Sequence, residues 1–162
     1  GQIKHVILDL SAKPCDTLNM EPKQNATENV DNSSKRVLLV EDDPINQELF
    51  AEYLKILGFE STSVSCAKSA VAALTSAIGS GGYGLVLMDL HMPQKDGVQA
   101  TIEWREIEDR EELKPTPIYA ITADVRTEER CRCLESGMNG FLSKPFRLSD
   151  LSRLLVEVMA EG

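Results

Sequence analysis

The sequence predicts an α/β fold, a doubly wound five-stranded parallel sheet with helices on both faces. Two observations favour this fold class. Strand-like and helix-like segments alternate five times from Lys35 onward, and such alternation is typical of parallel sheets with right-handed crossovers. Four short apolar runs also end on polar side chains. Because the carboxyl ends of parallel strands share one edge of the sheet, we expect these polar groups to converge there.

Each element follows from local signals. Short runs predict strands, at Arg36–Val40, Glu60–Val64, Leu85–Met88, Pro117–Ile121 and Gly140–Leu142. The intervening segments predict helices, between Asp43 and Gly58, over Ala67–Ile78, Val98–Arg110 and Thr127–Ser136, and from Ser149 onward. The first helix has the clearest punctuation, because Asp43 can cap it, Pro44 suits its first turn and Gly58 can end it.

Helical spacing also predicts which side chains are buried. In the first helix the apolar positions recur at this spacing, at Ile45, Leu49, Tyr53, Ile56 and Leu57. We expect Leu49 to belong to the core. The last helix places its apolar side chains on one side, at Leu151, Leu154, Leu155 and Val158.

The chain divides into an extension, residues 1–34, and a domain, residues 35–162. Within the extension, Ile3–Leu10 could form a short strand, either the end of an upstream module or an added edge strand. The stretch Ser11–Lys35 is rich in polar residues and has two prolines, which is typical of a linker.

Composition excludes several classes of function. The formal net charge of -9 argues against direct binding to nucleic acid, whose phosphates favour basic surfaces. No apolar run is long enough to cross a bilayer, so this segment is expected to make no membrane contact. The four cysteines have neither zinc-ligand nor redox spacing, which favours reduced thiols and a cytoplasmic location.

The polar groups that follow the strands predict the chemistry. Asp89 follows the most apolar run, and a carboxylate there can attack phosphorus and form an acyl phosphate. Glu41 and Asp42 follow the first strand, and together with Asp89 they favour a hard cation such as Mg²⁺, which binds carboxylates, water and phosphate oxygens. Asp43 is interpreted as a helix cap.

Two further residues complete this predicted site. Lys144 lies before Pro145, which restricts its backbone to extended geometry and allows a cis bond that would aim the ammonium inward. An ammonium is a suitable partner for phosphoryl oxygens. The Thr122 hydroxyl, followed by the small Ala123, can also donate to a phosphoryl group.

Motifs in this order resemble the receiver domain of two-component response regulators. The resemblance covers about residues 35–160 and rests on Val37–Gln47, Met88–Pro93 with Asp96-Gly97, Ile121–Ala123 and Lys144–Phe146. It implies a flavodoxin-like sheet in the strand order 2-1-3-4-5. The first of these motifs and the segment Gly137–Phe146 are most similar to receivers of hybrid sensor histidine kinases.

The resemblance implies a role for each site residue. Asp89 would accept a phosphoryl group from a phosphohistidine, and Lys144 and Thr122 would contact the phosphoryl oxygens. Mg²⁺ would be bound by Asp42, Asp89 and the backbone carbonyl of His91, with assistance from Glu41. The switch aromatic of the family, paired with Thr122, corresponds to Phe141, where a tyrosine is common.

The resemblance also implies a partner, a histidine-phosphotransfer domain or the phosphohistidine domain of a kinase. Its helix would dock on Ile45 and Asn46 beside Pro145. Three alternatives remain: a stand-alone response regulator, a Mg²⁺-dependent aspartyl-phosphate hydrolase, and a non-catalytic interaction module. A hydrolase of that kind normally has its nucleophile in a D-x-D motif after the first strand, whereas Asp89 follows the third.

Overall fold

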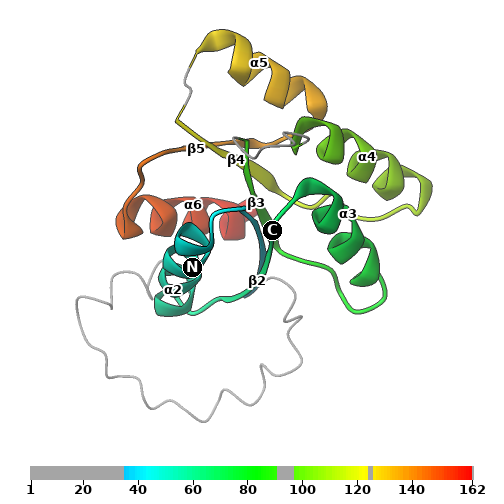
Figure 1. Cartoon of the computed structure of the whole chain (residues 1–162). Helices are drawn as coiled ribbons and strands as arrows, with labels where there is room; N and C mark the ends of the chain where they lie inside the picture. The colour runs from blue at the N-terminus through cyan, green and yellow to red at the C-terminus, as the bar shows by residue number, and fades with distance from the viewer. Residues whose placement is uncertain (1–34, 91–96, 124–125, 162) are drawn as a thin grey trace.

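The computed structural model describes residues 35–90, 97–123 and 126–161. In this part of the chain, strands and helices alternate (Figure 1). The strands are β1 (Arg36–Val40), β2 (Glu60–Val64), β3 (Leu85–Asp89), β4 (Ile118–Thr122) and β5 (Gly140–Ser143). The helices are α2 (Pro44–Ile56), α3 (Ala67–Ser76), α4 (Gly97–Arg110), α5 (Thr127–Ser136) and α6 (Leu148–Glu161).

The strands form one parallel sheet in the order β2-β1-β3-β4-β5, which confirms the predicted fold class and strand order. Helices α2 and α6 cover one face, and α3, α4 and α5 cover the other (Figure 1). Side chains alternate between the two faces, so that Leu39 packs toward α2 and α6, whereas Leu38 packs toward the other three helices. Each face of the sheet therefore has its own apolar core.

Helix α2 confirms the predicted cap, but only Leu57 and, in part, Tyr53 of its predicted apolar set pack into the core. The Asp43 carboxylate accepts a hydrogen bond from the backbone N–H of Ile45 at 2.9 Å. Leu49, expected in the core, is 43% exposed, and Ile45 is 75% exposed. The other buried side chains of α2 are Phe50 and Leu54, and the ring of Phe50 packs 4.6 Å from the ring of Phe146.

Other boundaries differ from the prediction by one or two residues. Three strands extend one residue further than predicted, so that Asp89, Thr122 and Ser143 are their last residues. Helix α6 begins at Leu148 rather than Ser149, because the Asp150 carboxylate reaches back to accept the Arg147 N–H at 2.9 Å. These differences keep the polar groups at the ends of strands.

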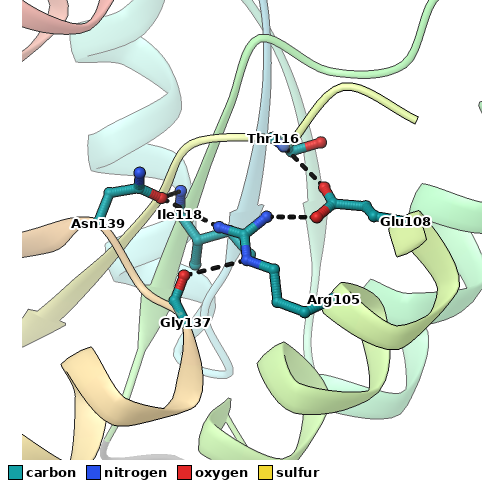
Figure 2. Close-up of polar contacts among 6 residues, drawn as sticks. All are labelled: Arg105, Glu108, Thr116, Ile118, Gly137 and Asn139. Atoms are coloured by element: carbon teal, nitrogen blue, oxygen red, sulfur yellow. Dashed lines mark hydrogen bonds and ion pairs between the residues drawn. The ribbon is translucent and has the colours of Figure 1, made fainter. Parts of the chain in front are cut away.

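A polar network fastens α4 to the start of β5 (Figure 2). The guanidinium of Arg105 donates from Nε to the Gly137 carbonyl at 3.0 Å and from Nη2 to Asn139 Oδ1 at 3.0 Å. Its Nη1 contacts Oε1 of the buried Glu108 at 2.7 Å. One side chain therefore holds α4 and the end of α5 together.

The same network reaches the start of β4. Oε2 of Glu108 accepts the Thr116 N–H at 2.7 Å. Asn139 accepts the Ile118 N–H through Oδ1 at 2.9 Å and donates its own N–H to the Ile118 carbonyl at 2.7 Å. The network thus lies at the amino ends of β4 and β5, opposite the edge where the predicted site residues follow the strands.

No helix in the described ranges combines the length and apolar character needed to span a membrane. The cysteines of these ranges, Cys66, Cys131 and Cys133, are free thiols, as predicted. The predicted extension, residues 1–34, lies outside the described residues.

Candidate functional site

The predicted site residues come from the carboxyl ends of four strands. Asp89 ends β3, Thr122 ends β4, Glu41 follows β1 and Lys144 follows β5. The register aligns Val40 with Met88, and Asp89 with Ile121. Because all the strands are parallel, these ends meet at one edge of the sheet, as the sequence predicts.

Three carboxylates form the centre of the site. Ligand atoms of Glu41, Asp42 and Asp89 lie within 4.8 Å of one another. Glu41 is 1% exposed and Asp89 is 2% exposed, whereas Asp42 is half-buried. Burial and then the neighbouring Asp89 carboxylate raise the pKa of Glu41 to about 7, although the Asp43 N–H and the Lys144 charge oppose this.

Lys144 is the cation of the site. Its Nζ lies 3.3 Å from Oδ2 of Asp89 and 3.7 Å from Oε1 of Glu41. The backbone N–H of Lys144 donates to the Thr122 carbonyl at 2.9 Å, and the Lys144–Pro145 peptide bond is cis. The ammonium of Lys144 contacts two of the three clustered carboxylates, so this single positive charge does not balance the charge of the whole cluster.

The donor set fits a hard divalent cation. Oε1 of Glu41 is buried and accepts no hydrogen bond from the part of the chain that the structure describes, and the Lys144 ammonium at 3.7 Å lies beyond hydrogen-bond distance. A buried carboxylate oxygen without a donor is costly unless a cation compensates it. Clustered carboxylate oxygens are the ligands that Mg²⁺ and Ca²⁺ prefer.

Backbone contacts fix the acidic loop, residues Glu41, Asp42 and Asp43, which joins β1 to α2. The Glu41 N–H donates to the Val64 carbonyl at 3.0 Å, and its Oε2 accepts the Asp43 N–H at 3.2 Å. The side chain of Gln47 donates to the Glu41 carbonyl at 2.5 Å. The sequence alone predicts no role for Gln47, because only the folded loop brings its amide to this carbonyl.

The two predicted switch residues occupy different environments. Thr122 is buried at the end of β4, next to Ser143 of β5. Phe141 is half-buried on β5, and the guanidinium of Arg130 on α5 lies 5.3 Å from the centre of its ring. His91, whose carbonyl is the remaining predicted ligand, lies outside the described residues.

The predicted docking residues lie on the surface to different degrees. Ile45 and Pro145 are exposed, and Asn46 is half-buried. Leu49 and Ile56, 43% and 47% exposed, extend the apolar surface along α2. An exposed apolar stripe on a helix commonly marks a protein-binding site.

Comparison with known proteins adds independent evidence. Residues 37–156 match the response regulator receiver domain. The osmosensing histidine protein kinase SLN1 of Saccharomyces cerevisiae is 37% identical over 132 residues, which cover 79% of this chain and 10% of that protein. The chain spans a tenth or less of the length of this and two further histidine kinases that it matches.

Two solved structures have the same fold. The receiver domain of sensor histidine kinase PA1611 from Pseudomonas aeruginosa, with magnesium in its active-site cleft, has a TM-score of 0.66 and 36% identity, covering 78% of this chain and 98% of that one. The receiver of Saccharomyces cerevisiae Ssk1, bound to the phosphotransfer protein Ypd1, has a TM-score of 0.67 and 29% identity, covering 75% and 86%. From these matches and the site at its strand ends, the chain belongs to the response regulator receiver domain family.

Proposed function

We propose that Asp89 accepts a phosphoryl group from a phosphohistidine in a Mg²⁺-dependent phosphorelay. The observation that carries the proposal is the convergence of Asp89, Glu41, Asp42 and Lys144 at one edge of the sheet. This arrangement supplies a nucleophile, a cation site and a fixed ammonium.

We assign the binding of Mg²⁺ to Asp42, Asp89 and the backbone carbonyl of His91, with Glu41 beside them. The fit rests on the three clustered carboxylates and on Oε1 of Glu41, which accepts no hydrogen bond from the described residues. When bound, Mg²⁺ supplies positive charge that neutralises the phosphoryl oxygens. The magnesium in the active-site cleft of the PA1611 receiver agrees with this assignment.

The reaction is an in-line displacement at phosphorus. A carboxylate oxygen of Asp89 forms the new bond to phosphorus as the bond from phosphorus to the donor imidazole nitrogen breaks, and that nitrogen keeps the electron pair. Lys144, already 3.3 Å from Asp89, balances the negative charge of the phosphoryl oxygens. The hydroxyl of Thr122 donates a hydrogen bond to the same group.

Incubation with Mg²⁺ and acetyl phosphate tests the assignment of Asp89. Intact-mass analysis should show one added phosphoryl group on the wild type and none on Asp89→Ala. Asp109→Ala, which removes an exposed carboxylate on α4, is the matched control and should be phosphorylated like the wild type. Phosphorylation of Asp89→Ala to the wild-type level would contradict the proposal.

The phosphodonor is assigned as a histidine-phosphotransfer domain or the phosphohistidine domain of a kinase. Its docking surface comprises Ile45 and Asn46 on α2 together with Pro145. Their partial or full exposure supports this, as does the Ssk1 receiver, which was solved in complex with the phosphotransfer protein Ypd1.

We further propose that residues 35–162 form the receiver domain of a hybrid histidine kinase and lie in the cytoplasm. Residues 1–34 would be the linker from an upstream module. Similarity to SLN1 and to the PA1611 receiver supports this parentage. A response regulator that is not part of a kinase is the second candidate, because the Ssk1 receiver belongs to a downstream response regulator.

Phosphorylation is proposed to act through Thr122 and Phe141. Movement of Thr122 toward the phosphoryl group would open space for the ring of Phe141 and alter the surface of α5, β5 and α6. The half-buried position of this ring between β5 and Arg130 supports such a role. Equal phosphorylation-dependent partner affinity in the wild type and in Phe141→Ala would count against it.

A further inference from the structure

We propose that Gln47, near the start of α2, is a positioning residue that sets Asp42 for binding Mg²⁺. The inference rests on the function proposed above and adds a residue outside the acidic cluster. Gln47 carries no charge and reaches no carboxylate of the site in the described contacts. Its effect is exerted through the backbone of the acidic loop.

Gln47 makes a hydrogen bond on each side of Asp42. Its side-chain amide Nε2 donates to the carbonyl of Glu41 at 2.5 Å. Its backbone N–H donates to the carbonyl of Asp43 at 2.9 Å. The two peptide carbonyls that flank Asp42 in sequence are therefore both fastened to the same residue of α2.

The loop needs such a fastening because its backbone has left the sheet. The last register pairs of β1 join Val40 to Val64 and to Met88. Glu41 still donates its N–H to Val64, but its carbonyl lies beyond the ladder and receives the Gln47 amide instead. Without that amide, this part-buried carbonyl would lose the donor that the structure gives it.

The fastening also opposes electrostatic repulsion. Glu41, Asp42 and Asp89 bring ligand oxygens within 4.8 Å of one another, and like charges at this separation drive the loop away from β3. A cation can bind all of these oxygens only while the loop stays in place. Gln47 thus lowers the free energy that is needed to bring the loop into the conformation that binds Mg²⁺.

Groups that orient metal ligands typically change metal affinity by about 10-fold to 100-fold when they are removed. For Gln47→Met, which keeps an unbranched side chain but loses the donor, we expect the Mg²⁺ dissociation constant to rise roughly tenfold. The rate of phosphorylation by acetyl phosphate should recover to near the wild-type value at saturating Mg²⁺, because Asp89 and Lys144 are untouched.

The experiment compares the wild type, Gln47→Met and Gln99→Met. The control makes the same change at an exposed position in the first turn of α4. Mg²⁺ affinity is measured by isothermal titration, the phosphorylation rate is measured against Mg²⁺ concentration, and urea unfolding in EDTA reports stability. We expect the half-saturating Mg²⁺ concentration to rise for Gln47→Met alone.

Gln47→Glu is a second variant that separates positioning from charge. An added carboxylate beside the acidic loop would tighten Mg²⁺ binding if charge alone mattered. We expect weaker binding, because the new side chain places an acceptor against the Glu41 carbonyl.

Unchanged Mg²⁺ affinity in Gln47→Met, or tighter binding in Gln47→Glu, would overturn the role of Gln47 while the wild type still binds Mg²⁺ and becomes phosphorylated. A wild type that neither binds Mg²⁺ nor becomes phosphorylated would overturn the proposed function itself and this inference with it.

Discussion

Substitution of Glu41 by Gln should make the protein progressively more stable than the wild type as pH rises. Moving the pKa of Glu41 from 4.5 to about 7 corresponds to about 3 kcal/mol, at about 1.4 kcal/mol for each pH unit. Between these pH values the folded protein keeps a proton on Glu41 and the unfolded chain has lost it. The free energy of unfolding of the wild type therefore falls as pH rises through this window.

Glu41→Gln removes this titration, since its neutral amide resembles the protonated acid. In EDTA the two proteins should be about equally stable near pH 4.5, and the variant should be more stable by about 3 kcal/mol at about pH 8. Urea unfolding followed by the fluorescence of Trp104, the single tryptophan and a buried one, measures the difference.

Mg²⁺ provides the control for the same measurement. Bound cation favours the ionised carboxylates, so millimolar Mg²⁺ should stabilise the wild type at high pH and reduce its deficit relative to Glu41→Gln. A stability difference between the two proteins that stays constant from acid to alkaline pH in EDTA would refute the reasoning.

Three further changes test the network and the docking surface. Arg105→Ala should lower the free energy of unfolding by about 3 kcal/mol, because buried Glu108 loses its cation. Arg132→Ala, which removes a more exposed ion pair, should change the free energy of unfolding by less than about 1 kcal/mol. Urea unfolding measures both variants, and equal effects would contradict the argument from burial. Gly137→Ala should lower the free energy of unfolding, measured by thermal unfolding, by about 2 kcal/mol. The φ angle of Gly137 is 111°, and the new Cβ would lie 2.9 Å from Cγ of Arg105. Ile45→Ala should slow phosphoryl transfer from a phosphohistidine domain roughly tenfold while phosphorylation by acetyl phosphate stays at the wild-type rate, and a loss of both would point to misfolding instead.

Local signals predicted most of the fold. The cap at Asp43, the strand Glu60–Val64 and the end of α5 at Gly137 follow from residue types at short spacing, and the structure confirms them. The grouping of Glu41 with Asp89 followed from one topological rule for parallel sheets. Periodicity alone failed for Leu49, which is 43% exposed although it recurs at helical spacing with the buried Leu57.

Long-range contacts explain what the sequence could not predict. Arg105 meets Gly137 across 32 positions of the chain, and no spacing rule joins two such residues. The burial of α2 depended on which side chain finds a ring to pack against, so Leu49 was assigned to the wrong side. The bond from Gln47 to Glu41 depends on the path of a short loop.

The buried side chains of helix α5 lie near its carboxyl end. Its buried side chains are Cys133 and Ser136, in the same part of the helix as the carbonyl that Arg105 holds. Tilting the helix about this anchored end would uncover little apolar area, whereas α4 is buried along its length from Gly97 to Glu108. The fold thus holds α5 at its carboxyl end, whereas its amino end, which follows the strand that ends at Thr122, can shift at little energetic cost.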